Sequence, residues 1–314
     1  MFLGIDGGAS KTAGVLADAG GRVVCREVAG RSAFSGRPSD EACVVLKGLA
    51  DALCGQAGVP VSGVESLGLG LSGVDFPEDL PMQRQVLAAA LGVAEERVHL
   101  VNDGIVALWG ATDSPEAALL QHGSGFTSAF RSRFGDEQLF DHLNVGRQFD
   151  LRAEAVKQVA RMLDGRVEAT GLKDAVLARL GVTAEEFPEA VYKNRVPLGS
   201  RSPLAPVVFA CWQGGDAAAE AIVREAAADY VLAAGAMVRR AGGGPAVAVF
   251  GGGVIMQAPP EFWDLLSDLM RDAYPEATVR QPELPPDAGA AVMAAFCAGR
   301  EPKAFFRRVR DSRP

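Results

Sequence analysis

The chain opens with a short apolar strand that runs directly into an aspartate and two glycines. Its first twelve residues are MFLGIDGGASKT, and apolar character resumes over Thr12–Ala17. A carboxylate at a strand end can face a metal ion, and the N–H groups of a glycine turn can receive phosphate oxygens. An ordinary hairpin explains the same pattern, because Asp-Gly is a strong hairpin signal. A Walker A loop does not fit, because Lys11 follows Ser10 rather than glycine and a second strand, not a helix, comes next.

The first third of the chain predicts alternating strands and helices. We expect strands, in order, over Leu3–Ile5, Thr12–Ala17, Arg22–Glu27, Glu65–Leu71 and Arg97–Val101. Helices are expected over 39–56, where Ser39 is suited to the N-cap, and over 81–90. The resulting order is βββαβαβ. A second cycle begins with an apolar run at Ala117–Leu120.

The remainder of the chain predicts a second half built around another strand. Residues 153–192 have a charged helical pattern, and 202–240 predict one or two long helices. Residues 246–250 form a buried-type strand that runs into Gly251-Gly252-Gly253. Two strand sets that each end in a glycine turn suggest two similar halves around a cleft. We place the domain boundary between 1–112 and 113–314, with a final helix near 288–299 that returns to the first domain.

Composition excludes several classes of protein. The 314 residues suffice for two domains, and a net charge of −8 with no basic cluster except Arg307–Arg310 disfavours nucleic-acid binding. We expect that basic end to be solvated. The sequence shows neither a secretory signal nor a run of about 18 apolar residues, so a cytoplasmic protein is expected. The cysteines are scattered without a Cys-x-x-Cys pair, which favours reduced thiols: Cys25, Cys43, Cys54, Cys211 and Cys297.

Asp103 is the candidate catalytic carboxylate. It lies in Leu100-Val101-Asn102-Asp103-Gly104, where an apolar strand stops and an Ala/Leu-rich helix begins. A carboxylate at such a junction can accept a proton from a substrate hydroxyl above the strand end. Because aspartate also caps helices well, a purely structural N-cap role is the alternative.

Two further glycine segments follow predicted strands. His122-Gly123-Ser124-Gly125 would let the backbone approach a phosphate closely, although a plain hairpin turn with a surface histidine fits as well. Gly251-Gly252-Gly253 offers either a flat face for a nucleotide ring or a flexible turn. The combination of segments is more specific than any single one.

Taken in order, these segments resemble the N-acetylglucosamine kinase and BadF/BadG/BcrA/BcrD ATPase family, of the superfamily that holds actin, hexokinase and the heat-shock chaperone ATPases. Leu204–Val208 and Pro286–Ala291 extend the resemblance over almost the whole chain. The resemblance implies an α/β fold with two RNase H-like, actin-like ATPase domains around a central nucleotide cleft. It also implies that ATP and Mg²⁺ are the cofactors.

The resemblance assigns roles residue by residue. It implies that Asp103 is the catalytic base and that Asp6 positions Mg²⁺. It implies nucleotide-binding roles for the first phosphate loop, the second phosphate loop and the adenosine pocket: Gly7, Gly8, Ala9, Ser10, Lys11, Thr12, Gly123, Ser124, Gly215, Gly251, Gly252 and Gly253. Acceptor-side roles fall to Asn102, His122, Asn144 and Gly146.

Departures from the family concentrate on the acceptor side. His122 replaces the small hydroxyl residue of the usual Gly-Thr-Gly-Ser, and Gly30–Ala33 lacks the asparagine of the usual Gly-Pro-x-Asn. Where relatives carry Gly-Asp-Glu-Gly-Ser, this chain has 143–147, so Asn144 replaces the sugar-binding carboxylate unless Asp141 or Asp150 serves instead. Neither the cysteine pairs of the iron–sulfur dehydratase activators nor the zinc motif of the ROK kinases is found.

Three functions therefore compete. An ATP-dependent kinase for an amino sugar or a related small metabolite fits the phosphate loops and Asp103. An ATPase-type or non-catalytic sensor that switches with nucleotide fits the altered acceptor motifs. A partner-binding α/β protein with only a likeness of fold would have no nucleotide affinity. The resemblance makes a homodimer possible, and neither nucleic acid nor membrane is expected as a partner.

Overall fold

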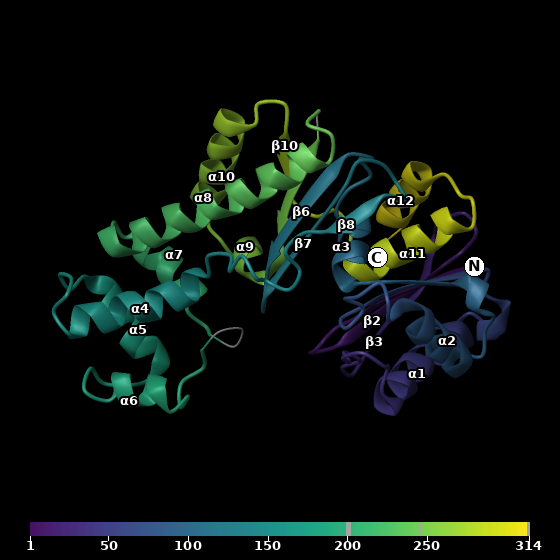
Figure 1. The fold of residues 1–314 in the computed structure, drawn as a ribbon, viewed down its shortest axis with the longest axis horizontal. Coiled ribbons are helices and arrows are strands. Elements are labelled where there is room, and N and C mark those ends of the chain that lie inside the picture. The colour runs from purple at the N-terminus through teal and green to yellow at the C-terminus, as the bar shows by residue number, and fades with distance from the viewer. Residues whose placement is uncertain (199–201, 245, 313–314) are drawn as a thin grey trace. The chain divides into compact units, whose positions relative to one another are not determined.

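The computed structural model describes residues 1–198, 202–244 and 246–312, and its strands form two five-stranded sheets (Figure 1). The first sheet has the order β3-β2-β1-β4-β5. Its strands are β1 (Phe2–Gly7), β2 (Thr12–Ala17), β3 (Val23–Ala29), β4 (Ser66–Leu71) and β5 (Val98–Val101). The predicted order βββαβαβ is confirmed for this part of the chain.

Strand β1 lies at the centre of the first sheet, and all of its residues except Asp6 are buried. It pairs antiparallel with β2 and parallel with β4, which in turn pairs parallel with β5. Gly7 is opposite Leu71, and Gly70 is opposite Val101. The carboxyl ends of β1, β4 and β5 therefore meet at one edge, where Asp6 and Asp103 are found.

Helices cover this sheet: α1 (Asp40–Gln56), η1 (Val61–Gly63), α2 (Leu80–Leu91), η2 (Glu95–Arg97), α3 (Asp103–Ala111), α11 (Pro286–Cys297) and α12 (Pro302–Asp311). The Ser39 hydroxyl caps α1 as predicted, accepting from the Ala42 N–H at 3.2 Å. Helix α11 packs on β1 and α3. A Cβ atom on Gly4 or Gly68 would come within 2.3 or 2.1 Å of the α11 backbone, so glycine allows this close approach.

The second sheet has the order β10-β9-β6-β7-β8. Its strands are β6 (Ala117–His122), β7 (Phe126–Arg131), β8 (Glu137–Leu139), β9 (Val247–Gly251) and β10 (Thr278–Arg280). The remaining helices are α4 (Leu151–Leu163), α5 (Gly171–Leu180), α6 (Phe187–Tyr192), α7 (Ala205–Gln213), α8 (Ala217–Arg240), α9 (Gly252–Met256) and α10 (Pro260–Ala273). The predicted helical region thus comprises separate helices, two of which, α7 and α8, lie within 202–240.

The chain divides into two compact units. The first comprises Met1–Leu119, Ala129–His142 and Gln281–Pro314, and the second comprises Leu120–Ser128 and Leu143–Arg280. The predicted final helix is present as α11 and belongs to the first unit. The boundary at residue 112 remains a prediction. None of the described helices is long and apolar enough to cross a membrane.

The Arg307 and Arg308 side chains are exposed, as the prediction of a solvated basic end requires, but the segment that carries them is helical. Residues 307–310 lie in α12, which Glu301 caps by accepting from the Lys303 and Ala304 N–H groups. One face of the helix is apolar, and its side chains are buried: Phe305, Phe306 and Val309. The Phe305 ring packs edge-on against Phe2 at 5.3 Å between ring centroids. The arginines occupy the other face of an amphipathic helix.

Candidate active site

Two carboxylates lie at the edge of the first sheet where its parallel strands end. Asp6 is the penultimate residue of β1, and Asp103 is the first residue of α3, directly after β5. Burial, followed by the charges of Asp103 and Asp287, raises the pKa of Asp6 to about 7, although Lys11 and Arg26 act to lower it. Negative charge is therefore concentrated here, which suits a site that binds a cation.

Asn102 is the N-cap of α3, so the alternative role considered for Asp103 belongs to its neighbour. The Asn102 Oδ1 accepts from the Gly104 N–H at 2.8 Å, and its Nδ2 donates to Asp75 at 2.9 Å. The Asp103 carboxylate also accepts from the Gly104 N–H, at 3.0 Å. Burial raises the pKa of Asp103, and the Asp75 charge adds to that effect. A raised pKa makes the ionised carboxylate a stronger base.

The first glycine turn is tightly packed at its base and open at its tip. A Cβ on Gly7 would lie 2.4 Å from the Ser32 Oγ, so a larger residue there would displace the Ser32 side chain. The Gly8 N–H donates to the Lys11 carbonyl at 3.0 Å. The tip residues Ala9, Ser10 and Lys11 are exposed. A hairpin and an exposed glycine turn are therefore both present.

Thr12 is held away from solvent. Its side chain is fully buried, and its hydroxyl lies 2.7 Å from both the Gly30 carbonyl and the Ser32 hydroxyl. These hydrogen bonds connect the start of β2 to Gly30–Ala33, the segment that corresponds to the family's Gly-Pro-x-Asn element. Thr12 therefore shapes the base of the turn.

In the second unit, the structure brings two of the predicted glycine segments together. A Cβ on Gly252, whose φ is +84°, would lie 2.5 Å from the His122 carbonyl carbon, and a Cβ on Gly123 would lie 3.6 Å from the Gly253 nitrogen. Both segments face a cavity of about 440 Å³. Its lining is Gly123, Ser124, Arg152, Arg179, Ser202, Pro203, Ala205, Pro206, Gly253, Val254 and Gln257. Gly251–Gly253 is not a flexible turn, because Gly252 begins helix α9.

His122 is buried in β6 and is not the surface residue that a plain turn would present. Its side chain is 0% exposed and stacks on Phe126 at 4.0 Å between ring centroids. Nδ1 lies 2.5 Å from the Tyr230 hydroxyl, and Nε2 lies 3.0 Å from the Arg152 guanidinium. Burial lowers the pKa of His122, so the ring is neutral at physiological pH. Its predicted contact with an acceptor remains a prediction.

Arg152 connects this histidine to the glycine turn. Its guanidinium donates to the Gly123 carbonyl at 2.9 Å and to the Ser124 carbonyl at 3.3 Å. It also forms two bonds to Asp150, of 2.9 and 2.8 Å. Burial raises the pKa of Asp150, but the nearby His122 ring, whose Nε2 lies 3.7 Å away, and the hydrogen bonds from Arg152 together bring it well below the usual range. Sequence reasoning missed Arg152, Tyr230, Asp75 and Asp287.

Three predicted residues lie outside these clusters. Gly215 connects α7 to α8 with φ of +82° and does not line the described cavity. Asn144 and Gly146 are exposed in the loop before α4, where the Asn144 Oδ1 accepts from the Gln148 N–H at 3.1 Å. Their binding roles remain predictions. Asp150 is already bonded to Arg152, so it is poorly placed to replace the family's sugar-binding carboxylate.

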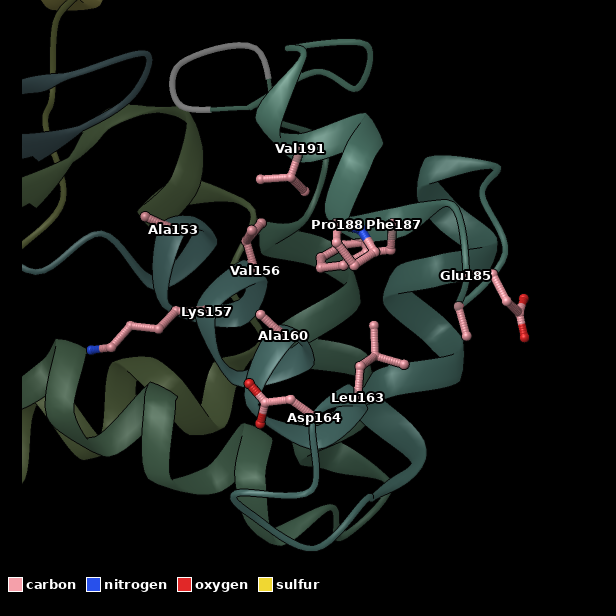
Figure 2. Close-up of a pocket in the computed structure, with 11 residues that line it drawn as sticks. Ala153, Val156, Lys157, Ala160, Leu163, Asp164, Glu185, Phe187, Pro188 and Val191 are labelled. Atoms are coloured by element: carbon pink, nitrogen blue, oxygen red, sulfur yellow. The ribbon is translucent and has the colours of Figure 1, made fainter.

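A second cavity, of about 810 Å³, lies between α4 and the segment 184–191 (Figure 2). Its walls are mainly apolar side chains, among them Val156, Leu163 and Phe187, and the charged end of Glu185 points away from them. The cavity has no glycine turn that could bind phosphate. We therefore assign it no part in the candidate active site.

The described residues contain no group of three or more His, Cys, Asp or Glu side chains that could hold a metal ion by themselves. Mg²⁺ does not require such a group, because it is usually bound through one or two carboxylates together with substrate phosphates and water. Asp6, buried beside other carboxylates, is suited to this arrangement. The residues therefore fit a magnesium ion delivered with a nucleotide.

Comparison with known proteins decides the family. Residues 3–294 match the model of the BadF/BadG/BcrA/BcrD ATPase family. The chain belongs to this family. An N-acetylmuramic acid/N-acetylglucosamine kinase of Clostridium acetobutylicum is 26% identical over 75% of this chain and 78% of its own length. An N-acetyl-D-glucosamine kinase of Dictyostelium discoideum is 25% identical over 94% of this chain and 97% of its own.

Solved structures agree at the level of the fold of this BadF/BadG/BcrA/BcrD family member. A protein of Chromobacterium violaceum with a provisional description as an N-acetylglucosamine kinase has a TM-score of 0.69 at 21% identity, covering 93% of this chain and 98% of that one. The ROK hexokinase of Thermus thermophilus has a TM-score of 0.58 at 22% identity, covering 94% and 97%. The predicted family and fold class are confirmed.

Proposed function

We propose that this protein is an ATP-dependent kinase that transfers a phosphoryl group to a hydroxyl of an amino sugar, with N-acetylglucosamine as the first candidate. One observation carries the proposal: Asp103 stands at the carboxyl edge of the first sheet with a raised pKa, in a chain whose curated relatives are N-acetylglucosamine kinases. A strand-end carboxylate of this kind is what hydroxyl deprotonation needs.

In the proposed mechanism, Asp103 accepts the proton of the acceptor hydroxyl as that oxygen attacks the γ-phosphorus of ATP. The bond from this phosphorus to the oxygen that bridges the β- and γ-phosphates breaks, and ADP leaves. Its hydrogen bond from Gly104 and the Asn102 cap fix the carboxylate at the start of α3. Asp6 would hold Mg²⁺, which when bound offsets charge on the β- and γ-phosphates. Preorganised donors reduce the reorganisation needed in the transition state.

Backbone N–H groups of the glycine turns would bind the phosphates. In the first turn these are the groups at the exposed tip, from Ala9 to Lys11, because the Gly8 N–H is already bonded to the Lys11 carbonyl. In the second, the Gly123 N–H is already bonded to the Gly125 carbonyl at 2.9 Å, so we assign the donor role to Ser124 and Gly125. The apolar side chains beside Gly253, including Pro206 and Val254, suit an adenine ring.

The proposal places the enzyme in the cytoplasm, where ATP is abundant, and keeps a homodimer as a prediction. A nucleotide-dependent sensor is the second candidate. Asn144, in place of the carboxylate of the family motif, favours it, because an exposed amide binds sugar hydroxyls less strongly than a carboxylate does.

Coupled ADP release with Mg·ATP tests the proposal. The acceptor panel contains N-acetylglucosamine, N-acetylmuramic acid, neutral hexoses and a control without acceptor. We expect ADP release that depends on an amino sugar. Turnover without an acceptor would indicate an ATPase switch, and ATP binding without turnover would favour the sensor.

A further inference from the structure

The buried cluster of Arg152, His122, Asp150 and Tyr230 borders the second glycine turn without belonging to it. All four side chains come from the second unit: His122 from β6, Asp150 and Arg152 from the start of α4, and Tyr230 from α8. Arg152 is only 4% exposed, although arginine seldom lies so deep in a protein. The hydrogen bonds of its guanidinium therefore compensate for the burial of its charge.

The bonds of Arg152 act on both sides of the turn. On one side it donates to the carbonyl oxygens of Gly123 and Ser124. Because these carbonyls point at the guanidinium, the N–H groups that follow them are directed elsewhere. On the other side, both oxygens of Asp150 bind the guanidinium in a two-point pair, which fixes its plane.

The same contacts determine which nitrogen of His122 carries the proton. The Arg152 Nη2 atom has two hydrogens, and its two shortest contacts are with Asp150 Oδ2 at 2.8 Å and His122 Nε2 at 3.0 Å. Because a guanidinium only donates, Nε2 is the acceptor in this contact. A neutral imidazole then carries its hydrogen on Nδ1 and donates it to the Tyr230 hydroxyl at 2.5 Å. The groups that face this ring are Arg152 and Asp150 from α4 and Tyr230 from α8, with Asp229 next to the tyrosine.

We propose that Arg152 is a positioning residue for nucleotide binding: by holding the Gly123 and Ser124 carbonyls and the Nδ1–H form of His122, it keeps the second glycine turn in the shape that receives phosphate. This inference rests on the proposed function, because it assumes that this turn binds ATP. Arg152 itself need not touch the nucleotide. Its side chain instead determines how the backbone donors point.

Substitution of Arg152 tests the role through ATP binding. Arg152→Gln should weaken Mg·ATP binding, measured by calorimetry, by about tenfold or more, as expected when charge-assisted hydrogen bonds are lost. The KM for ATP should rise, whereas the KM for the acceptor should stay within about twofold. Arg152→Lys keeps the charge without the planar fork and should restore binding only in part.

Two controls separate positioning from general stability. Arg166→Gln removes an exposed arginine paired with Asp164 and makes the same change in net charge. Leu172→Ala removes a fully buried side chain of α5 in the same unit and lowers stability without touching the turn. Neither should change the Kd for ATP by more than about twofold. If Leu172→Ala weakens ATP binding as much as Arg152→Gln does, the positioning role is wrong.

A spectroscopic measurement tests the contact itself, independently of activity. The chain has three histidines, so ¹⁵N NMR of histidine-labelled protein gives few signals. The signals that are missing from the spectrum of the His122→Phe variant are those of His122. The wild-type spectrum should show His122 with a protonated Nδ1 and an unprotonated Nε2. In Arg152→Gln, or in Arg152→Lys should the first variant not fold, this pattern should be lost.

The outcomes are distinguishable. If the wild-type protein binds no Mg·ATP, the proposed function fails and this inference fails with it. If the wild type binds and a folded Arg152→Gln binds equally well, only the positioning role is overturned. The inference is also overturned if His122 carries its proton on Nε2 in the wild-type protein.

Discussion

Ionisation of the Asp6 carboxyl destabilises the folded protein when no cation is bound beside it. Its pKa is raised from the ordinary 3.8 to about 7, first by burial and then by Asp103 and Asp287. A raised carboxyl pKa means that ionisation costs more in the folded state than in the unfolded state. The destabilisation is absent below about pH 4, grows as pH rises toward 7, and is complete above it.

Asp6→Asn should therefore stabilise the protein in the absence of nucleotide and Mg²⁺. We expect the free energy of unfolding to rise by about 2–4 kcal/mol at pH 8 and by less at pH 5. The size follows from the upward shift of the Asp6 pKa. Urea unfolding at the two pH values measures it. The same variant should lose Mg²⁺-dependent ATP binding. An equal or larger gain at pH 5 would show that the Asp6 carboxyl is not the titrating group.

Asp103 should set the acid limb of the pH–rate profile. Because burial raises its pKa, activity falls on acidification at a pH above the range of an ordinary aspartate. The profile of kcat/KM against pH, at saturating Mg²⁺, measures this limb. A limb at the pH of an exposed carboxyl would contradict the assignment.

The start of helix α3 is the element that places the candidate base. Asn102 caps the helix and at the same time holds Asp75, so both ends of its amide are used. The chain offers a matched helix start in α1, where Ser39 caps by the same type of bond. The two caps allow the effect of helix stability to be separated from the effect on catalysis.

Asn102→Ala and Ser39→Ala should each lower the free energy of unfolding by about 1 kcal/mol, the usual cost of a lost N-cap. Only Asn102→Ala should also lower kcat, because only that cap adjoins Asp103. Thermal unfolding and ADP release, measured on both variants, give the comparison. If Ser39→Ala lowers kcat to the same extent, the cap acts through stability alone.

The first unit as a whole depends on the C-terminal helices, which return to its sheet. Helix α11 packs on β1, β4 and α3, and α12 buries Phe305, Phe306 and Val309. Residues from both ends of the chain therefore share one core. The C-terminal helices therefore complete the core beneath the sheet that carries Asp6.

Phe306→Ala should lower the free energy of unfolding by about 3–5 kcal/mol, as is typical when a buried aromatic side chain is truncated. The control is Arg308→Ala, on the exposed face of the same helix, which should change it by no more than about 0.5 kcal/mol. Denaturant titrations of both variants measure the difference. Similar values for the two would mean that α12 contributes little to the core.

Much of this architecture could be predicted from local patterns. Strand and helix order followed from apolar periodicity, and Ser39 was identified as a cap because cap signals are local. The C-terminal helix was missed because Arg307–Arg310 was interpreted as a charge run, although Phe305, Phe306 and Val309 have helical spacing. The contact between His122 and Tyr230 joins residues 108 positions apart, which no local pattern reveals.

The most direct test of the account compares wild-type protein with Asp103→Asn, measuring amino-sugar-dependent ADP release and Mg·ATP affinity on the same preparations. The substitution keeps the size of the side chain and removes the base. We predict that kcat falls by about 10²-fold to 10⁴-fold, the usual contribution of a general base, while the Kd for Mg·ATP changes by less than about threefold. Full turnover by Asp103→Asn would contradict the account.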